Sequence, residues 1–203
     1  MSKSNYRFAI GINTVQATLH HATELIELSQ KHPEYTKLLS ACAVAVLASA
    51  FQQGIRWTLQ VVAHNMSAED DIPLNDTSSA KLLDKSFREQ MLELPGLISS
   101  GEFAINEREP LARALNNLIT CRNKLMHIDD PVRLLTENSA PIKITNQKVQ
   151  ISIPLPENPW DSINLSDVQQ FERAVKTYLD EAVSIEKMSQ RRSSLLVRRS
   201  NKQ

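Results

Sequence analysis

Apolar side chains recur every three or four residues along most of this chain, the spacing that places them on one face of an α-helix. Residues 13–31 follow this pattern, and Pro33 stops it. Residues 34–65 continue it, and their first half is apolar almost all round, as in a helix enclosed by other elements. We therefore expect two long helices before residue 66, the second of them central to the core.

Three further helices are expected in the rest of the chain. Residues 67–79 are acidic and polar and indicate a loop, and residues 79–94 form the third helix, ended by Pro95 and Gly96. The fourth helix runs over residues 106–128, with Asn106 as its cap and Pro110 in its first turn. The final helix begins at Ser166–Asp167. Its expected inward residues are Val168, Phe171, Val175, Tyr178, Leu179, Ala182 and Ile185.

The periodicity changes to strict alternation before that last helix. Residues 141–154 alternate apolar and polar side chains on both sides of Asn146-Gln147, which predicts a small β-hairpin. The fold class that follows is all-α: an up-and-down bundle of about five helices over residues 1–190, with the hairpin as an insertion. Residues 191–203 are basic and are expected to form a flexible tail, an RNA-binding arm, or, through Leu195-Leu196-Val197, a patch that docks a partner.

The composition excludes several classes of protein. A chain of 203 residues that is 41% hydrophobic suits one domain, and its 23 basic and 23 acidic residues create no global field for nucleic acid or membrane. Four glycines disfavour a Gly-rich phosphate loop.

The apolar run over residues 38–51 is short of the roughly 20 residues that span a bilayer. With no signal peptide and two cysteines, Cys42 and Cys121, predicted to be free buried thiols, we expect a cytoplasmic location and no membrane partner.

The fourth helix carries the candidate chemistry. Leucines at residues 111, 115, 118 and 125 form one row, and the missing member of that row is Arg122. A polar row lies beside it, and in that row Asn123 and His127 are one turn apart. Arg122 is about 140° from His127 around the helix, but its long side chain can reach the same edge. We therefore expect guanidinium, carboxamide and imidazole to converge where the apolar row meets the polar one.

These three groups suit the cleavage of RNA without a metal. An imidazole can move a proton near neutral pH, and a guanidinium binds phosphate and stabilises charge that grows on it. The 2′-hydroxyl of the substrate would supply the nucleophile, so the reaction needs neither a catalytic serine or cysteine nor a cofactor.

The sequence Arg122-Asn123-Lys124-Leu125-Met126-His127, late in a helix of an all-helical domain, resembles the Arg-x4-His motif of HEPN-domain proteins. Many members of that family are metal-independent endoribonucleases of toxin and phage-defence systems. The resemblance implies that Arg122 and His127 are catalytic and that Asn123 positions them. It also implies a homodimer with a composite active site, an RNA substrate, and an antitoxin or defence protein as a possible partner.

The long second helix departs from the family pattern at one place. Related domains often have an acidic residue there, in a phrase like Phe-Glu-x-x-x-Lys/Arg, whereas this chain has Gln52 after Phe51, followed by Arg56. Glutamine can form hydrogen bonds but cannot pair with a cation. Gln52, Arg56 and Lys124 are weaker candidates for substrate contacts, and a catalytically inactive HEPN-like module that binds RNA or a protein is the alternative function.

Several residues also have purely structural interpretations. Arg122 could cap backbone carbonyls or pair with Asp129, and His127 could interact with the negative end of its helix. Asp129 and Asp130 could orient the imidazole or solvate the helix end. Trp57 could stack on RNA or lie in the core. His20, His21 and Glu24 lack a third histidine or a cysteine cluster nearby, so we expect a solvated helix face there and no metal site.

Overall fold

The computed structural model describes most of the helical body of the protein. The described backbone comprises residues 3–70, 73–126, 143–145, 148–150, 163–183 and 195–199. Side chains are described for residues 14–69, 73–125, 163–183 and 195–199.

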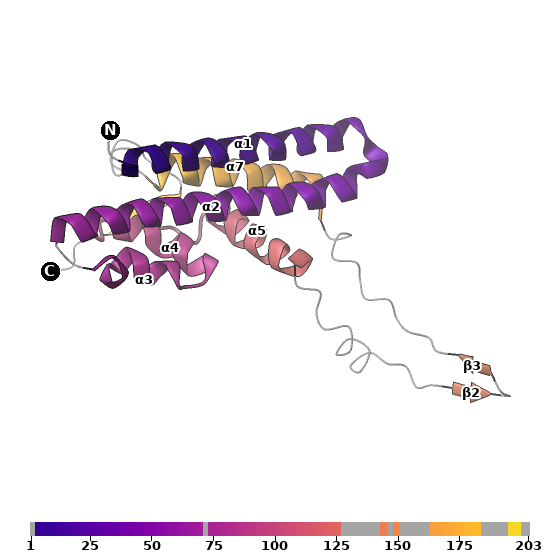
Figure 1. Ribbon diagram of the computed structural model, residues 1–203. Coiled ribbons are helices and arrows are strands. Elements are labelled where there is room, and N and C mark those ends of the chain that lie inside the picture. Colours follow the sequence, from indigo (N-terminus) through magenta and orange to yellow (C-terminus); the bar gives the residue numbers. More distant parts are fainter. Residues whose placement is uncertain are drawn as a thin grey trace.

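An antiparallel helical hairpin forms the longest part of the structure (Figure 1). It consists of α1 (Lys3–Lys31), the short 3-10 helix η1 (Pro33–Tyr35) and α2 (Thr36–Asp70). Buried Ser29 donates to the backbone oxygen of Thr36 at 3.3 Å, and the hydroxyl of Thr36 donates back to the oxygen of Ser29 at 3.1 Å. This reciprocal pair fixes the turn between the two helices. Both helices predicted from the sequence are confirmed, and both are longer than the predicted ranges 13–31 and 34–65.

The predicted third helix, residues 79–94, is two helices in the structure. A short 3-10 helix, η2 (Leu74–Asp76), leads into α3 (Ser78–Leu83), and α4 (Phe87–Ile98) follows after a break. Ser86 caps α4: its hydroxyl accepts from the backbone of Glu89, and the Glu89 carboxylate accepts from the backbone of Ser86. This capping box provides hydrogen-bond partners for backbone amides at the start of α4, so a second helix begins at Phe87 and does not continue α3.

Pro95 and Gly96 do not end α4, contrary to the prediction. Pro95 lies inside the helix, which continues to Ile98, and the hydroxyl of Ser99 donates to the oxygen of Pro95 at 2.6 Å. Gly101, with a φ of 87°, makes the turn that follows. Pro95 has no N–H to offer the carbonyl of Met91 one turn earlier, and that carbonyl accepts instead from the hydroxyl of Tyr178 at 2.7 Å.

A two-stranded antiparallel sheet joins distant parts of the chain, and the sequence did not predict it. Strand β1 (Phe103–Ile105) pairs with β4 (Leu196–Arg198), with Ala104 opposite Val197. Leu195 is fully buried, and its backbone oxygen accepts from Asn106 at 2.9 Å. Residues 195–199 therefore differ from the expected flexible tail and complete the body of the protein.

The remaining elements in the described part of the chain are α5 (Pro110–Met126), the hairpin strands β2 (Lys143–Thr145) and β3 (Lys148–Gln150), and α7 (Leu165–Glu181). The antiparallel pairing of β2 with β3 confirms the hairpin before the last helix. Asn106 does not cap α5; its side-chain oxygen accepts from the backbone of Arg108, within the turn that precedes the helix.

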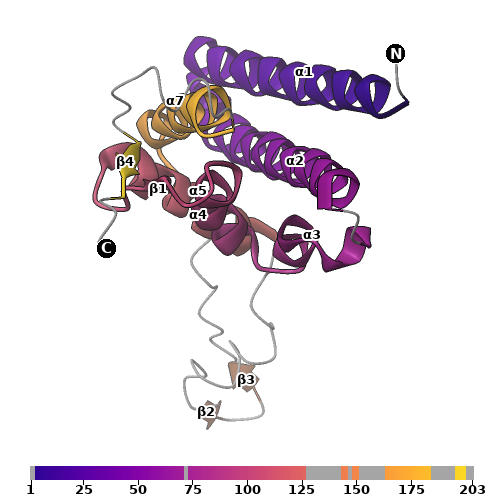
Figure 2. The same ribbon diagram turned by 90° about the vertical axis from the view of Figure 1, so that its left-hand side faces the viewer.

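The core lies where α2 meets the other helices. Viewed end-on, α2 lies between α1 and α7 on one side and the layer of α3, α4 and α5 on the other (Figure 2). Phe51 of α2 packs edge-on against Tyr178 of α7, with ring centroids 5.0 Å apart. Five of the seven predicted inward residues of the last helix are buried and Leu179 packs against the core, while Ile185 lies outside the described residues. The predicted all-α fold is confirmed.

One described helix, over Pro33–Glu69, is long and apolar enough to cross a membrane by length and composition alone. Half of its most apolar window is buried inside the protein. The central helix of a helical bundle has the same composition, so this finding is weak evidence for a membrane span.

Candidate functional site

Arg122 lies in the middle of the buried face of α5. The neighbouring members of its row, Leu115 and Leu118, are fully buried, and Leu125 packs against the core. Ile119 and Ala112 flank the same face and are also buried. Arg122 itself is half-buried, one turn before the described end of the helix. The predicted replacement of a core leucine by arginine is therefore present in the structure.

Asn123 holds the guanidinium of Arg122. The Nη1 atom of Arg122 donates to Oδ1 of Asn123 at 3.0 Å. Because this bond uses one of the five N–H donors of the guanidinium, the others stay available to a ligand such as phosphate. Asn123 and Lys124 are both exposed, so the end of α5 presents polar groups to solvent.

The polar row of α5 continues toward the start of the helix. The hydroxyl of Thr120 donates to the backbone oxygen of Asn116 at 2.9 Å. The Oδ1 atom of Asn116 is buried and has no hydrogen-bond partner among the described residues. A buried acceptor without a partner costs free energy, on the order of 1–3 kcal/mol. The polar row of α5 therefore has both exposed members, Thr120 and Asn123, and a member with a buried polar atom, Asn116.

His127, the expected proton-transfer residue, lies outside the described residues, as do Asp129 and Asp130. The structure brings Arg122 and Asn123 together, but it describes no distance from either of them to the imidazole. The convergence of all three groups therefore stays a prediction.

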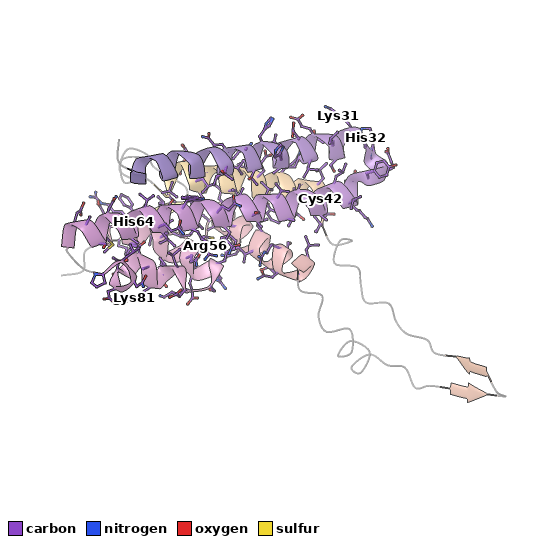
Figure 3. All side chains as sticks on the ribbon, in the orientation of Figure 1. Lys31, His32, Cys42, Arg56, His64 and Lys81 are labelled. Carbon is purple, nitrogen blue, oxygen red and sulfur yellow. The ribbon has the colours of Figure 1, made fainter. Side chains whose placement is uncertain are left out.

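The weaker substrate candidates differ in exposure. Gln52 and Trp57 are half-buried on α2, whereas Arg56 is exposed on the same helix and is labelled in Figure 3. No hydrogen bond joins Gln52 or Arg56 to Arg122 among the described side chains. Gln52 and Arg56 therefore lie on α2 and take no part in the hydrogen bond between Arg122 and Asn123.

Cys121 precedes Arg122 and is a free, half-buried thiol, as is Cys42 of α2. Burial raises the pKa of the Cys121 thiol, and the nearby Lys124 offsets only part of that effect. The thiol therefore stays protonated at neutral pH, and a thiolate nucleophile at this position is disfavoured. The prediction that both cysteines are free is confirmed, but neither is fully buried.

The histidine pair of α1 lies on a solvated face. His21 Nδ1 lies 3.0 Å from the carboxylate of Glu24, and His20 Nε2 lies 3.5 Å from it. The hydrogen bond from His21 lowers the pKa of Glu24. Among the described residues, no group of three histidine, cysteine, aspartate or glutamate side chains is arranged to hold a metal ion.

A polar cluster between α1 and α7 was not predicted. Glu172 of α7 accepts from the hydroxyl of Thr23 at 2.5 Å and from Lys176 at 2.6 Å. Gln169, Arg173 and Thr177 extend it along a shallow hollow on α7. The Glu-Lys spacing of four residues was visible in the sequence, but the contribution of Thr23 depends on the packing of α1 and α7. The cluster joins the two helices.

Comparison with known proteins gives no relative for this chain. No protein-family model, no curated protein and no solved structure matches it.

Proposed function

We propose that this protein is a metal-independent endoribonuclease that acts in the cytoplasm as a toxin or defence effector. The observation that carries the proposal is the position of Arg122, which takes a half-buried place in the apolar row of α5 and whose guanidinium donates to the exposed Asn123 at 3.0 Å. A charge beside the core costs free energy unless a partner or a function compensates for it. A phosphoryl group is a ligand that would compensate.

The proposed reaction starts from the substrate itself. The imidazole of His127 removes the proton of a ribose 2′-hydroxyl, and the resulting oxygen attacks the adjacent phosphorus. The P–O5′ bond breaks, and an acid, a second imidazole or water, protonates the leaving oxygen. The products are a 2′,3′-cyclic phosphate and a 5′-hydroxyl. Arg122 stabilises the additional negative charge on the phosphoryl oxygens in the transition state.

Three further residues would contribute to substrate binding. Arg56 and Lys124 are exposed cations, so each can reach the phosphate backbone of RNA without losing a contact in the core. Gln52 can form a hydrogen bond to a base or a ribose. In this proposal two chains contribute to one composite site.

Incubation of the purified protein with single-stranded and structured RNA in EDTA tests the proposal. We expect cleavage that leaves 2′,3′-cyclic phosphate ends and that falls by at least about 100-fold in His127→Ala and Arg122→Ala. Arg122→Lys should restore little activity, because an ammonium lacks the planar fork of a guanidinium.

Two matched variants control for the loss of a histidine or an arginine elsewhere. His64→Ala removes an exposed histidine of α2, and Arg113→Ala removes an exposed arginine of α5 whose guanidinium donates to the backbone oxygen of Arg108. Both should cleave like the unaltered protein. Cleavage that survives the substitution of Arg122 and of His127 would refute the site. RNA binding without cleavage would identify an inactive binding module.

A further inference from the structure

The exposed side of α5 is built from residues that weaken a helix. Four of them lie within about a third of the helix circumference, and we call them the α5 amide face: Asn116, Asn117, Thr120 and Asn123. Asn116 is half-buried and the other three are exposed. Asparagine and threonine are poor helix formers. Beyond its first turn, the exposed side of α7 consists instead of good helix formers: Gln169, Gln170, Arg173 and Lys176.

Hydrogen bonds within the protein do not explain this composition. The hydroxyl of Thr120 donates to the backbone oxygen of Asn116, which already accepts a bond within the helix. Within the described part of the chain, the carboxamide of Asn117 has no hydrogen bond, and Oδ1 of Asn116 is buried without a partner. Residues that contradict the local structure without a structural gain are typical of functional sites. The α5 amide face is thus a candidate ligand-binding surface.

Charge and polarity indicate the kind of ligand. Helix α5 contains no aspartate or glutamate, and its cations Arg122 and Lys124 lie in its last two turns beside the α5 amide face. Asn123 belongs to this face and also accepts from the guanidinium of Arg122, so the two are continuous. None of the exposed large apolar side chains in the described part of the chain lies on α5, so the face lacks the apolar centre of a protein interface. A polar, negatively charged ligand fits these features.

We infer that the α5 amide face reads the bases of single-stranded RNA next to the phosphate that Arg122 binds. The inference rests on the RNA-binding part of the proposed function, because that phosphate places the strand beside α5. Each carboxamide offers two N–H donors and an oxygen acceptor, which complement the edges of bases. Asn116 and Asn123 are two turns apart, roughly 10 Å, which corresponds to about three stacked nucleotides at roughly 3.4 Å each.

Single-stranded RNA fits this face better than a duplex. The bases of an A-form duplex lie in a deep, narrow major groove that side chains do not read, whereas unpaired bases expose all of their hydrogen-bonding edges. Because the side chains of asparagine and threonine are short, they need bases that come close to the helix. Lys124 would contact the backbone of the same strand and add affinity without selecting a sequence.

Fluorescence anisotropy with single-stranded 2′-fluoro oligonucleotides, each repeating one base, tests the inference. These probes lack the attacking 2′-hydroxyl, so binding is measured without cleavage. We expect the unaltered protein to bind its preferred base at least about 10-fold more tightly than the weakest one, and Asn117→Ala to reduce that ratio to about 3-fold or less. Thr120→Val should narrow the preference in the same direction. Lys124→Ala should instead weaken the binding of all probes alike and reduce the slope of log affinity against log salt by about 0.7.

Two readouts separate recognition from structure. Asn117→Ala should raise the melting temperature by about 1–3 °C, because alanine is the better helix former and no hydrogen bond is lost. Gln170→Ala removes an exposed carboxamide of α7 and should leave the base preference and the salt slope unchanged. A lower melting temperature of Asn117→Ala would give Asn117 a structural role and overturn the inference.

Three binding results would overturn it as well: equal affinity for all the bases, a preference that Asn117→Ala leaves intact, or tighter binding of duplex RNA. A base preference in a protein that does not cut RNA in EDTA would support the α5 amide face and refute the nuclease. Cleavage without any base preference would support the nuclease and refute the role of the α5 amide face.

Discussion

Tyr178 combines a buried ring with a buried polar group. Its side chain is fully buried, and its hydroxyl donates to the backbone oxygen of Met91 at 2.7 Å. Burial raises the pKa of this hydroxyl well above its usual value, so it stays protonated and remains a donor. The bond joins α7 to α4 across the core.

Tyr178→Phe should therefore lower the free energy of unfolding by about 1–3 kcal/mol, because the carbonyl of Met91 would lose its partner inside the protein. Urea denaturation measures this change. Tyr35→Phe is the matched control: Tyr35 is 56% exposed in η1, and its replacement should leave the midpoint unchanged. Equal midpoints for Tyr178→Phe and the unaltered protein would contradict the role of the hydrogen bond.

Single residues differ in how far the sequence alone predicts them. The half-buried position of Arg122 followed from the vacant place in a leucine row, which is a property of one helix. Its hydrogen bond with Asn123 also involves neighbours along the chain. The contact of Thr23 with Glu172 joins residues far apart in sequence, and no local pattern could have predicted it.

The break between α3 and α4 depends on the Ser86–Glu89 capping box. Ser86→Ala removes the cap, and a loss of about 0.5–2 kcal/mol of stability is expected at neutral pH. The hydrogen bonds from Ser86 lower the pKa of Glu89. A carboxylate with a lowered pKa stabilises the folded protein above the pKa of the unfolded chain, and that contribution is lost as the pH falls through the folded pKa.

The effect of Ser86→Ala should accordingly shrink at acidic pH, where Glu89 is protonated in the folded protein too. Thermal unfolding at neutral pH and below the usual pKa of glutamate compares the two conditions. Ser100→Ala offers an exposed serine outside any helix as a control. A pH-independent difference would show that Ser86 acts without the Glu89 carboxylate.

Gly54 allows α2 and α7 to pack closely. A Cβ atom added at this residue would lie 2.5 Å from a terminal methyl of Leu179, well inside contact distance. Gly54→Ala should therefore destabilise the protein by about 1–3 kcal/mol from overpacking, reduced by the roughly 1 kcal/mol that alanine gains over glycine in a helix.

A double-mutant cycle separates these two terms. In a Leu179→Ala background the space is open, so Gly54→Ala should be neutral or stabilising there. Chemical denaturation of the four proteins gives the coupling. The same penalty in both backgrounds would mean that Leu179 is not the contact that matters.

The sequence predicted a helix correctly where the apolar side chains recur at helical spacing over many residues, as in α1, α2, α5 and α7. The predicted single helix over residues 79–94 failed because the apolar spacing continues across Ser86, while the hydrogen bonds of the cap decide where a helix begins. The pairing of β1 with β4 was missed because strands of three residues have too few alternations to distinguish them from loops.

At the scale of the whole molecule, the last described segment, residues 195–199, adds to the core: β4 pairs with β1, and Leu195 just before it is part of the core. Leu195 is fully buried, whereas Val197, two residues later, is 45% exposed. Leu195→Ala should cost about 2–5 kcal/mol of stability, because it leaves a cavity in the core. Val197→Ala should change the free energy of unfolding by less than about 0.5 kcal/mol. Denaturant titration of both variants measures the two changes in the free energy of unfolding. Similar losses of stability in Leu195→Ala and Val197→Ala would mean that Leu195 contributes no more than a surface residue.

The pairing of β1 with β4 also has a consequence for the order of folding. The helical hairpin of α1 and α2 forms from neighbouring segments, so its contacts require little loop closure. The ends of the β1–β4 pair are separated by α5, the hairpin strands and α7, so this pairing costs the entropy of closing a long loop. We expect the two strands to join last, and amide hydrogens of β4 to exchange with solvent before those in the middle of α2.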